Sequence, residues 1–130
     1  VRNPKKAAAL KQDFANFAEI EVFDWTGDEF KEQLEYTDIL INTTPLGMYP
    51  NVDEMPPVDI SKLPEGAFVY DVIYTPKKTK FLQKAEELGY PILNGESMLA
   101  YQGVESFRLF TGVETEAEIM LDALNKYLNK

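Results

Sequence analysis

Three short stretches of the chain, at residues 43–48, 72–76 and 94–98, suit ligand-binding loops. Each follows an apolar run and combines threonine, asparagine, glycine or proline. Threonine hydroxyls and backbone N–H groups can bond a ribose or a phosphate, and glycine allows a ligand to approach the backbone closely. The same residue types also build ordinary turns. One such stretch alone favours a turn, whereas three in series at strand ends favour a binding site.

A basic patch at the start of the chain could hold an anion. Arg2, Lys5 and Lys6 stand there without any acid among residues 1–12, although the whole chain has a net charge of −9. In dinucleotide-binding folds, an acid after the second strand binds the ribose 2′-hydroxyl, whereas arginine accommodates a 2′-phosphate. If the chain has such a fold, the patch therefore predicts NADP rather than NAD. The alternative is a solvated helix start that happens to be basic.

The composition limits the other kinds of chemistry. The chain has 130 residues, 45% of them apolar, which fits one soluble domain. It contains no histidine and no cysteine, which removes the commonest general base, thiolate chemistry and a disulfide framework. The acidic balance argues against nucleic acid. No apolar run approaches the roughly 20 residues of a membrane span. We expect a cytoplasmic protein without a metal site.

The polar stretches must be positioned by strands and helices that alternate along the sequence. Apolar runs predict strands at residues 20–23, 38–42, 67–73 and 91–93. Helices are expected at residues 4–17, 26 or 28 to 34, 79–88, 96–110 and 115–128. Gly89 and Gly112 should end two of these helices, and Thr115 should cap the last. This alternation predicts an α/β domain with a mainly parallel sheet, whose strand ends would gather the polar stretches.

Four motifs in order resemble the shikimate dehydrogenase family. Residues 42–48 read Asn-Thr-Thr-Pro-Leu-Gly-Met, and residues 71–82 carry Asp-x-x-Tyr-x-Pro-x-x-Thr-x-Phe-Leu. Residues 95–102 fit Gly-x-x-Met-Leu-x-x-Gln, and residues 106–112 fit Ala-Phe-x-x-(Trp/Phe)-x-Gly, with Ser106 in place of alanine. The order and spacing of these motifs hold from Arg2 to the last helix.

The resemblance implies a Rossmann-like, NADP-binding three-layer sandwich over residues 1–130. Such an oxidoreductase interconverts 3-dehydroshikimate and shikimate by hydride transfer in chorismate and aromatic amino-acid biosynthesis. The implied cofactor-binding residues are Arg2, Asn3, Lys5, Lys6, Thr43, Thr44, Val72, Gly95, Met98 and Leu99. Tyr74 and Gln102 are the implied contacts to shikimate, although Gln102 could instead be the solvent edge of its helix. Asp71 is expected to be a structural carboxylate bonded to backbone N–H groups.

Several parts of the family pattern are not matched in this sequence. The first strand with its Gly-rich turn and the substrate domain with its catalytic Lys and Asp are missing, and Val1 and Asn3 depart from the family's Asn-Arg-Thr. We therefore expect part of a longer enzyme that is inactive alone and associates through exposed strand edges or as a homodimer. Two alternatives stay open: a quinate/shikimate dehydrogenase that uses NAD, and a non-catalytic α/β module that binds a nucleotide or a protein partner.

Overall fold

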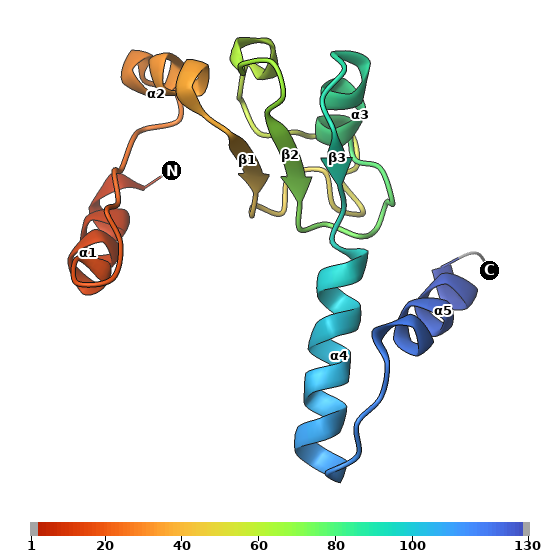
Figure 1. Ribbon diagram of the computed structural model, residues 1–130. Coiled ribbons are helices and arrows are strands. Elements are labelled where there is room, and N and C mark those ends of the chain that lie inside the picture. The colour runs from red at the N-terminus through yellow and green to blue at the C-terminus, as the bar shows by residue number, and fades with distance from the viewer. Residues whose placement is uncertain (1–2, 129–130) are drawn as a thin grey trace. The chain divides into compact units, whose positions relative to one another are not determined.

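The computed structural model describes residues 3–128, which divide into two compact units (Figure 1). The first unit comprises Val1–Asp38 and Pro57–Ala67, and the second comprises Ile39–Pro56 and Phe68–Lys130. None of the helices among residues 3–128 is long and apolar enough to cross a membrane.

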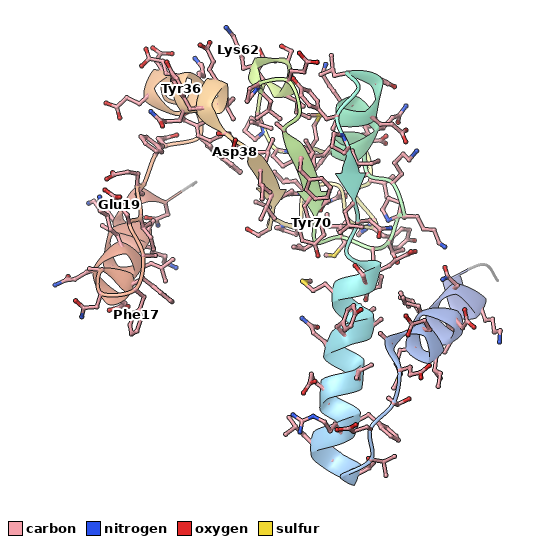
Figure 2. All side chains as sticks on the ribbon, viewed as in Figure 1. Phe17, Glu19, Tyr36, Asp38, Lys62 and Tyr70 are labelled. Carbon is pink, nitrogen blue, oxygen red and sulfur yellow. The ribbon has the colours of Figure 1, made fainter. Side chains whose placement is uncertain are left out.

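The first unit is helical. It contains α1 (Pro4–Phe14), α2 (Asp28–Gln33) and the single 3₁₀ turns η1 (Leu34–Tyr36) and η2 (Ile60–Lys62). Its buried apolar side chains are Leu34, Ile60, Leu63 and Ala67. Proline at the first position favours the start of α1, since its missing N–H would be unpaired there in any case. Figure 2 labels Tyr36 and Lys62 on the two 3₁₀ turns.

The second unit is built on a three-stranded parallel sheet, drawn as three side-by-side arrows in Figure 1. The strands β1 (Ile39–Asn42), β2 (Phe68–Asp71) and β3 (Ile92–Leu93) lie in that order, with Asn42 opposite Asp71. Helices α3 (Lys80–Glu87), α4 (Glu96–Thr111) and α5 (Ala117–Leu128) complete the unit. The buried apolar side chains of the sheet, the segment after β2 and α3 are Val69, Ile73, Phe81, Leu82 and Ala85. The predicted α/β fold with a parallel sheet is thereby confirmed.

The predicted strand at residues 20–23 is wrong. This segment has no strand partner among residues 3–128, and a strand needs a neighbouring strand to form its hydrogen-bond ladder. Helix α1 ends at Phe14 instead of residue 17. Strand β2 ends at Asp71 instead of residue 73 because the Asp71 carboxylate accepts the Ile73 N–H at 3.0 Å, in place of a ladder hydrogen bond.

The sequence predicts Thr26 or Asp28 as the cap of α2 and Thr115 as the cap of α5, and both predictions are wrong. The cap of α2 is Gly27, since Thr26 instead bonds the Asp24 carboxylate through its hydroxyl at 2.6 Å. Helix α5 begins at Ala117. The residue directly before it, in the cap position, is therefore Glu116 and not Thr115. By contrast, Gly112 ends α4 with a left-handed φ of 70°, as predicted.

Candidate functional site

A pocket of about 370 Å³ lies where β1 and β2 end. Its lining residues are Thr43, Thr44, Pro45, Met48, Tyr49, Val72, Ile73, Tyr74 and Thr75. Because the parallel register places the last residues of the two strands opposite each other, the loops that follow them leave the sheet at one edge. This edge is where open α/β sheets bind their ligands.

A buried carboxylate organises the two loops that line the pocket. Asp71 is fully buried, and its Oδ1 accepts hydrogen bonds from Ile73 N at 3.0 Å and from Asn42 Nδ2 at 3.2 Å. Its Oδ2 accepts a hydrogen bond from the Thr79 hydroxyl at 2.7 Å. Thr79 also caps α3, since its Oγ1 accepts from Leu82 N at 3.3 Å. Asp71 is thus the structural carboxylate that the sequence predicted.

The side chain of Asn42 gives the second of the two threonines after β1 a structural role. Its Oδ1 accepts hydrogen bonds from the Thr44 N–H at 3.0 Å and from the Thr44 hydroxyl at 2.7 Å. The Thr44 hydroxyl in turn accepts from Leu46 N at 3.3 Å. Such side-chain bonds to the nearby backbone define a local turn. Thr44 therefore shapes the loop, whereas the exposed Thr43 is the better candidate for direct contact with a ligand.

Gly95 lets the turn before α4 lie directly against the loop after β2. A Cβ atom at Gly95 would lie only 1.9 Å from Val72 O. The Gly95 N–H donates a hydrogen bond to Ile73 O at 3.0 Å. Only glycine allows two backbones to approach this closely. The turn that carries Gly95 is therefore fixed against the pocket residue Val72.

The structure brings together part of the predicted site. Thr43, Thr44, Val72 and Tyr74 line one pocket, and Gly95 contacts Val72. Met98, Leu99 and Gln102 lie on α4 and are not among the pocket-lining residues. Residues that the sequence analysis did not select as site residues also line it, namely Pro45, Met48, Tyr49, Ile73 and Thr75. Their position in the same two loops is the sequence signal that could have identified them.

The predicted phosphate-binding residues belong to the first unit. Asn3 caps α1, and its Oδ1 accepts a hydrogen bond from Lys6 N at 3.2 Å. Lys5 and Lys6 are exposed on the first turn of this helix, which contains no acid. A helix N-terminus with exposed lysines attracts anions. Arg2 lies outside the described residues.

The pocket can bind and orient a ligand more readily than it can transfer protons. Its lining combines one proline, methionine, valine and isoleucine each with three threonines and two tyrosines, and none of these side chains is a carboxylate, an amine or an imidazole. Tyr70 lies on β2 and does not line the pocket. Burial is the larger cause that raises the pKa of Tyr70, and the charge of Asp71 is the smaller one. No three His, Cys, Asp or Glu side chains between residues 3 and 128 are placed to hold a metal ion. The fold and the pocket define an α/β protein with a parallel sheet and a candidate ligand site where its strands end.

Comparisons with known proteins narrow this class to one family. The family described as "Shikimate 5'-dehydrogenase C-terminal domain" matches residues 95–124. The shikimate dehydrogenase (NADP(+)) of Methanococcus aeolicus is 42% identical over 123 residues, which are 95% of this chain and 44% of that protein. A crystal structure of a shikimate dehydrogenase in complex with NADP+ has a TM-score of 0.87 at 38% identity, covering 99% of this chain and 45% of that one.

A second solved structure is relevant to the cofactor and substrate alternatives. The quinate dehydrogenase of Corynebacterium glutamicum in complex with NAD has a TM-score of 0.82 at 29% identity, covering 96% of this chain and 44% of that one. The chain spans less than half the length of these relatives. It belongs to the shikimate dehydrogenase family.

Proposed function

We propose that this chain provides an NADP-binding part of a shikimate dehydrogenase, an oxidoreductase that interconverts 3-dehydroshikimate and shikimate. The observation that carries the proposal is the meeting of Thr43, Val72 and Tyr74 at one pocket where the parallel strands end. The names of the relatives support the cofactor, since the M. aeolicus protein is a shikimate dehydrogenase (NADP(+)) and a similar solved enzyme holds NADP+.

The pocket residues fit the nicotinamide half of this cofactor. A pocket of about 370 Å³ with apolar walls suits a flat ring and excludes water from it. In this proposal Val72 and Gly95 border the nicotinamide, Met98 and Leu99 pack nearby, and Thr43 bonds a ribose hydroxyl. The reduced cofactor NADPH, when bound, would supply the hydride for the reduction of 3-dehydroshikimate, and NADP+ would accept it in the reverse reaction.

Two residues of this chain are proposed to contact the substrate. Tyr74 lines the pocket with 37% of its surface exposed, so its hydroxyl can donate a hydrogen bond to a carboxylate or hydroxyl of shikimate. Gln102 is exposed on α4, and its amide offers both a donor and acceptors to such a ligand. The proton of the substrate hydroxyl would be handled by a Lys and Asp pair for which this sequence has no match.

The basic patch of Arg2, Lys5 and Lys6, with Asn3, is proposed to hold the 2′-phosphate and the adenosine side of NADP. The support is the exposed position of Lys5 and Lys6 on the first turn of α1. Arginine binds phosphate through two parallel N–H groups, and lysine adds a point charge. The remaining sequence predictions, a cytoplasmic location and association of two chains, stay predictions.

The alternative with support is a quinate dehydrogenase that uses NAD, because a similar solved enzyme is a quinate dehydrogenase in complex with NAD. Dissociation constants for NADP+ and NAD+ should be measured by NMR titration for the native chain and for Arg2→Asp. We expect tighter binding of NADP+ to the native chain and loss of this preference in Arg2→Asp. Equal affinities for both cofactors in both proteins would remove the argument from the basic patch.

Activity tests the enzymatic part of the proposal. We expect no reduction of NADP+ by shikimate with the 130-residue chain alone. Activity should be present in a chimera in which this chain replaces the matched segment of the M. aeolicus enzyme. A folded chimera that binds neither cofactor nor shikimate would contradict the proposed function and favour a non-catalytic α/β module.

A further inference from the structure

Lys77, which neither lines the pocket nor belongs to the predicted site, bonds three separate elements of the second unit. It lies in the loop between β2 and α3. Its Nζ donates a hydrogen bond to Asn125 Oδ1 of α5 at 2.6 Å and lies 3.3 Å from Glu96 Oε1 of α4. Its carbonyl oxygen accepts a hydrogen bond from Asn94 Nδ2, in the turn before α4, at 2.9 Å.

The contact with Glu96 compensates a largely buried negative charge. The Glu96 side chain is 18% exposed, whereas that of Lys77 is 44% exposed. Within the described residues, Glu96 Oε1 accepts no hydrogen bond of good geometry. The ion pair with Lys77 is therefore the contact that balances this oxygen. A partly buried carboxylate that loses its cation destabilises its surroundings more than an exposed one does.

The same contacts connect the two loops that the proposed ligand would touch. Residues 72–75 line the pocket, and the turn at Gly95 is held against them by its hydrogen bond to Ile73 O. Lys77 lies further along the loop that follows β2 and holds it to the same turn on both sides of Gly95. Its carbonyl oxygen contacts Asn94, and its ammonium group contacts Glu96. Displacement of this loop would change the distance between Val72 and the start of α4.

We propose that Lys77 is a positioning residue that sets the spacing between the pocket loop after β2 and the turn before α4, and that couples both to α5 through Asn125. The spacing between these two loops is a property of the chain without any bound ligand. Its effect on ligand binding rests on the proposed function, because NADP is the ligand whose nicotinamide would lie between these loops.

The neighbouring Lys78 provides a matched control. It forms an ion pair with Glu86 at 2.7 Å, and the two side chains are 48% and 52% exposed. The Lys78→Met substitution removes the same charge and the same number of atoms as Lys77→Met, one residue away. It does not touch the contacts at Asn94, Glu96 or Asn125. Exposed pairs of this kind contribute little to stability.

Amide hydrogen exchange of the 130-residue chain tests the spacing directly. In Lys77→Met we expect the Gly95 N–H to exchange about tenfold faster, since local opening determines its protection. The Val69 N–H, which donates to Pro91 O at 3.0 Å in the sheet, should keep its rate. Lys78→Met should change neither amide, and Lys77→Arg, which retains the charge, should restore the protection of Gly95.

Three exchange results would overturn the inference. The first is unchanged exchange at Gly95 in Lys77→Met, and the second is an equal loss of protection at Gly95 and Val69, which would mean general destabilisation. The third is the same effect in Lys78→Met. If Lys77→Met fails to fold, Glu96→Gln and Asn125→Ala replace it, because each removes one arm of the contact set. They should accelerate the exchange of Gly95 without that of Val69.

NADP+ titration of the same proteins separates this inference from the proposed function. Lys77→Met should weaken the affinity about tenfold, as expected for displacement of a binding loop by a fraction of an ångström, and Lys77→Arg should restore most of it. No binding by the native chain would contradict the proposed function and leave the exchange result to decide the inference. Equal binding by the native chain and Lys77→Met, with unchanged exchange, would contradict only the inference.

Discussion

Replacing Gly95 with alanine should push apart the two backbones that meet beside the pocket. The added Cβ would lie 1.9 Å from Val72 O and 2.5 Å from Val72 C, whereas ordinary contacts begin at 3.4 Å. The turn must therefore move by about 1.5 Å, the difference between the first and last of these distances. Because the clash is with backbone atoms, no side-chain rotation can relieve it. The movement also breaks the hydrogen bond from Gly95 N to Ile73 O.

The cost follows from these two effects. Loss of the hydrogen bond removes about 1 kcal/mol, and forcing atoms into a packed region costs about 1–3 kcal/mol. The free energy of unfolding should fall by about 2–4 kcal/mol. For a chain of this length, the midpoint of thermal unfolding should fall by roughly 10 °C. The affinity for NADP+ should fall at least about tenfold, since the displaced turn borders the proposed nicotinamide site.

Circular dichroism on heating and titration with NADP+ measure both effects. Gly103→Ala is the control on the same helix, because a Cβ there meets nothing closer than Met120 Sδ at 3.8 Å. It should stabilise the chain by about 0.4–1 kcal/mol, as alanine reduces the entropy of the unfolded state. The reasoning is refuted if Gly95→Ala unfolds within about 2 °C of the native chain and binds NADP+ equally well.

Three further predictions concern the carboxylates and Tyr70. Thr79→Ala loses the hydrogen bond to Asp71 and the cap of α3, so urea unfolding should show a loss of about 2–4 kcal/mol that Thr79→Ser largely avoids; equal losses would contradict this. Hydrogen bonds from lysine partners lower the pKa of Asp28 and Asp53 below 3.8. The stability that these two ion pairs add is therefore present above pH 3.8 and is lost as the pH falls below that value, which urea unfolding at a series of pH values should show. Burial raises the pKa of Tyr70 above 10.0, so the related stability should be lost only as the pH rises beyond that value. The difference in phenolate absorbance between the native chain and Tyr70→Phe isolates this side chain, and a midpoint at or below pH 10.0 would contradict the prediction.

The sheet and the edge with the pocket could be predicted from the sequence because the signals there are local and agree. The apolar runs that become β1 and β2 are short and lack polar interruptions, which is typical of parallel strands buried on both faces. Burial on both faces is wrong for β1, since Ile39 and Ile41 are 58% and 50% exposed. Because the strands are parallel, the polar stretches that follow them must then lie at the same end of the sheet. Thr79 and Gly89 bound α3 because a hydroxyl cap and a left-handed glycine act within one turn of the helix.

Other features depend on partners that are distant in the sequence. Residues 20–23 alternate like a strand, but a strand forms only where another strand can pair with it. Lys77 looks like an ordinary surface lysine, since its partner Asn125 lies 48 residues further along the chain. The buried carboxylate of Asp71 likewise accepts hydrogen bonds from Asn42 of β1 and from Thr79, the cap of α3. The spacing of these residues in the sequence does not reveal that they meet.

NMR titration of the isotope-labelled chain with NADP+ and shikimate tests the central claim most directly, because it detects weak binding residue by residue. We expect NADP+ to shift the amide signals of Thr43, Val72 and Gly95 together, and Lys5 and Lys6 to respond more strongly to NADP+ than to NAD+. Shikimate should then shift Tyr74. If millimolar NADP+ shifts none of these signals, or shifts only residues away from the edge where β1 and β2 end, the account is contradicted.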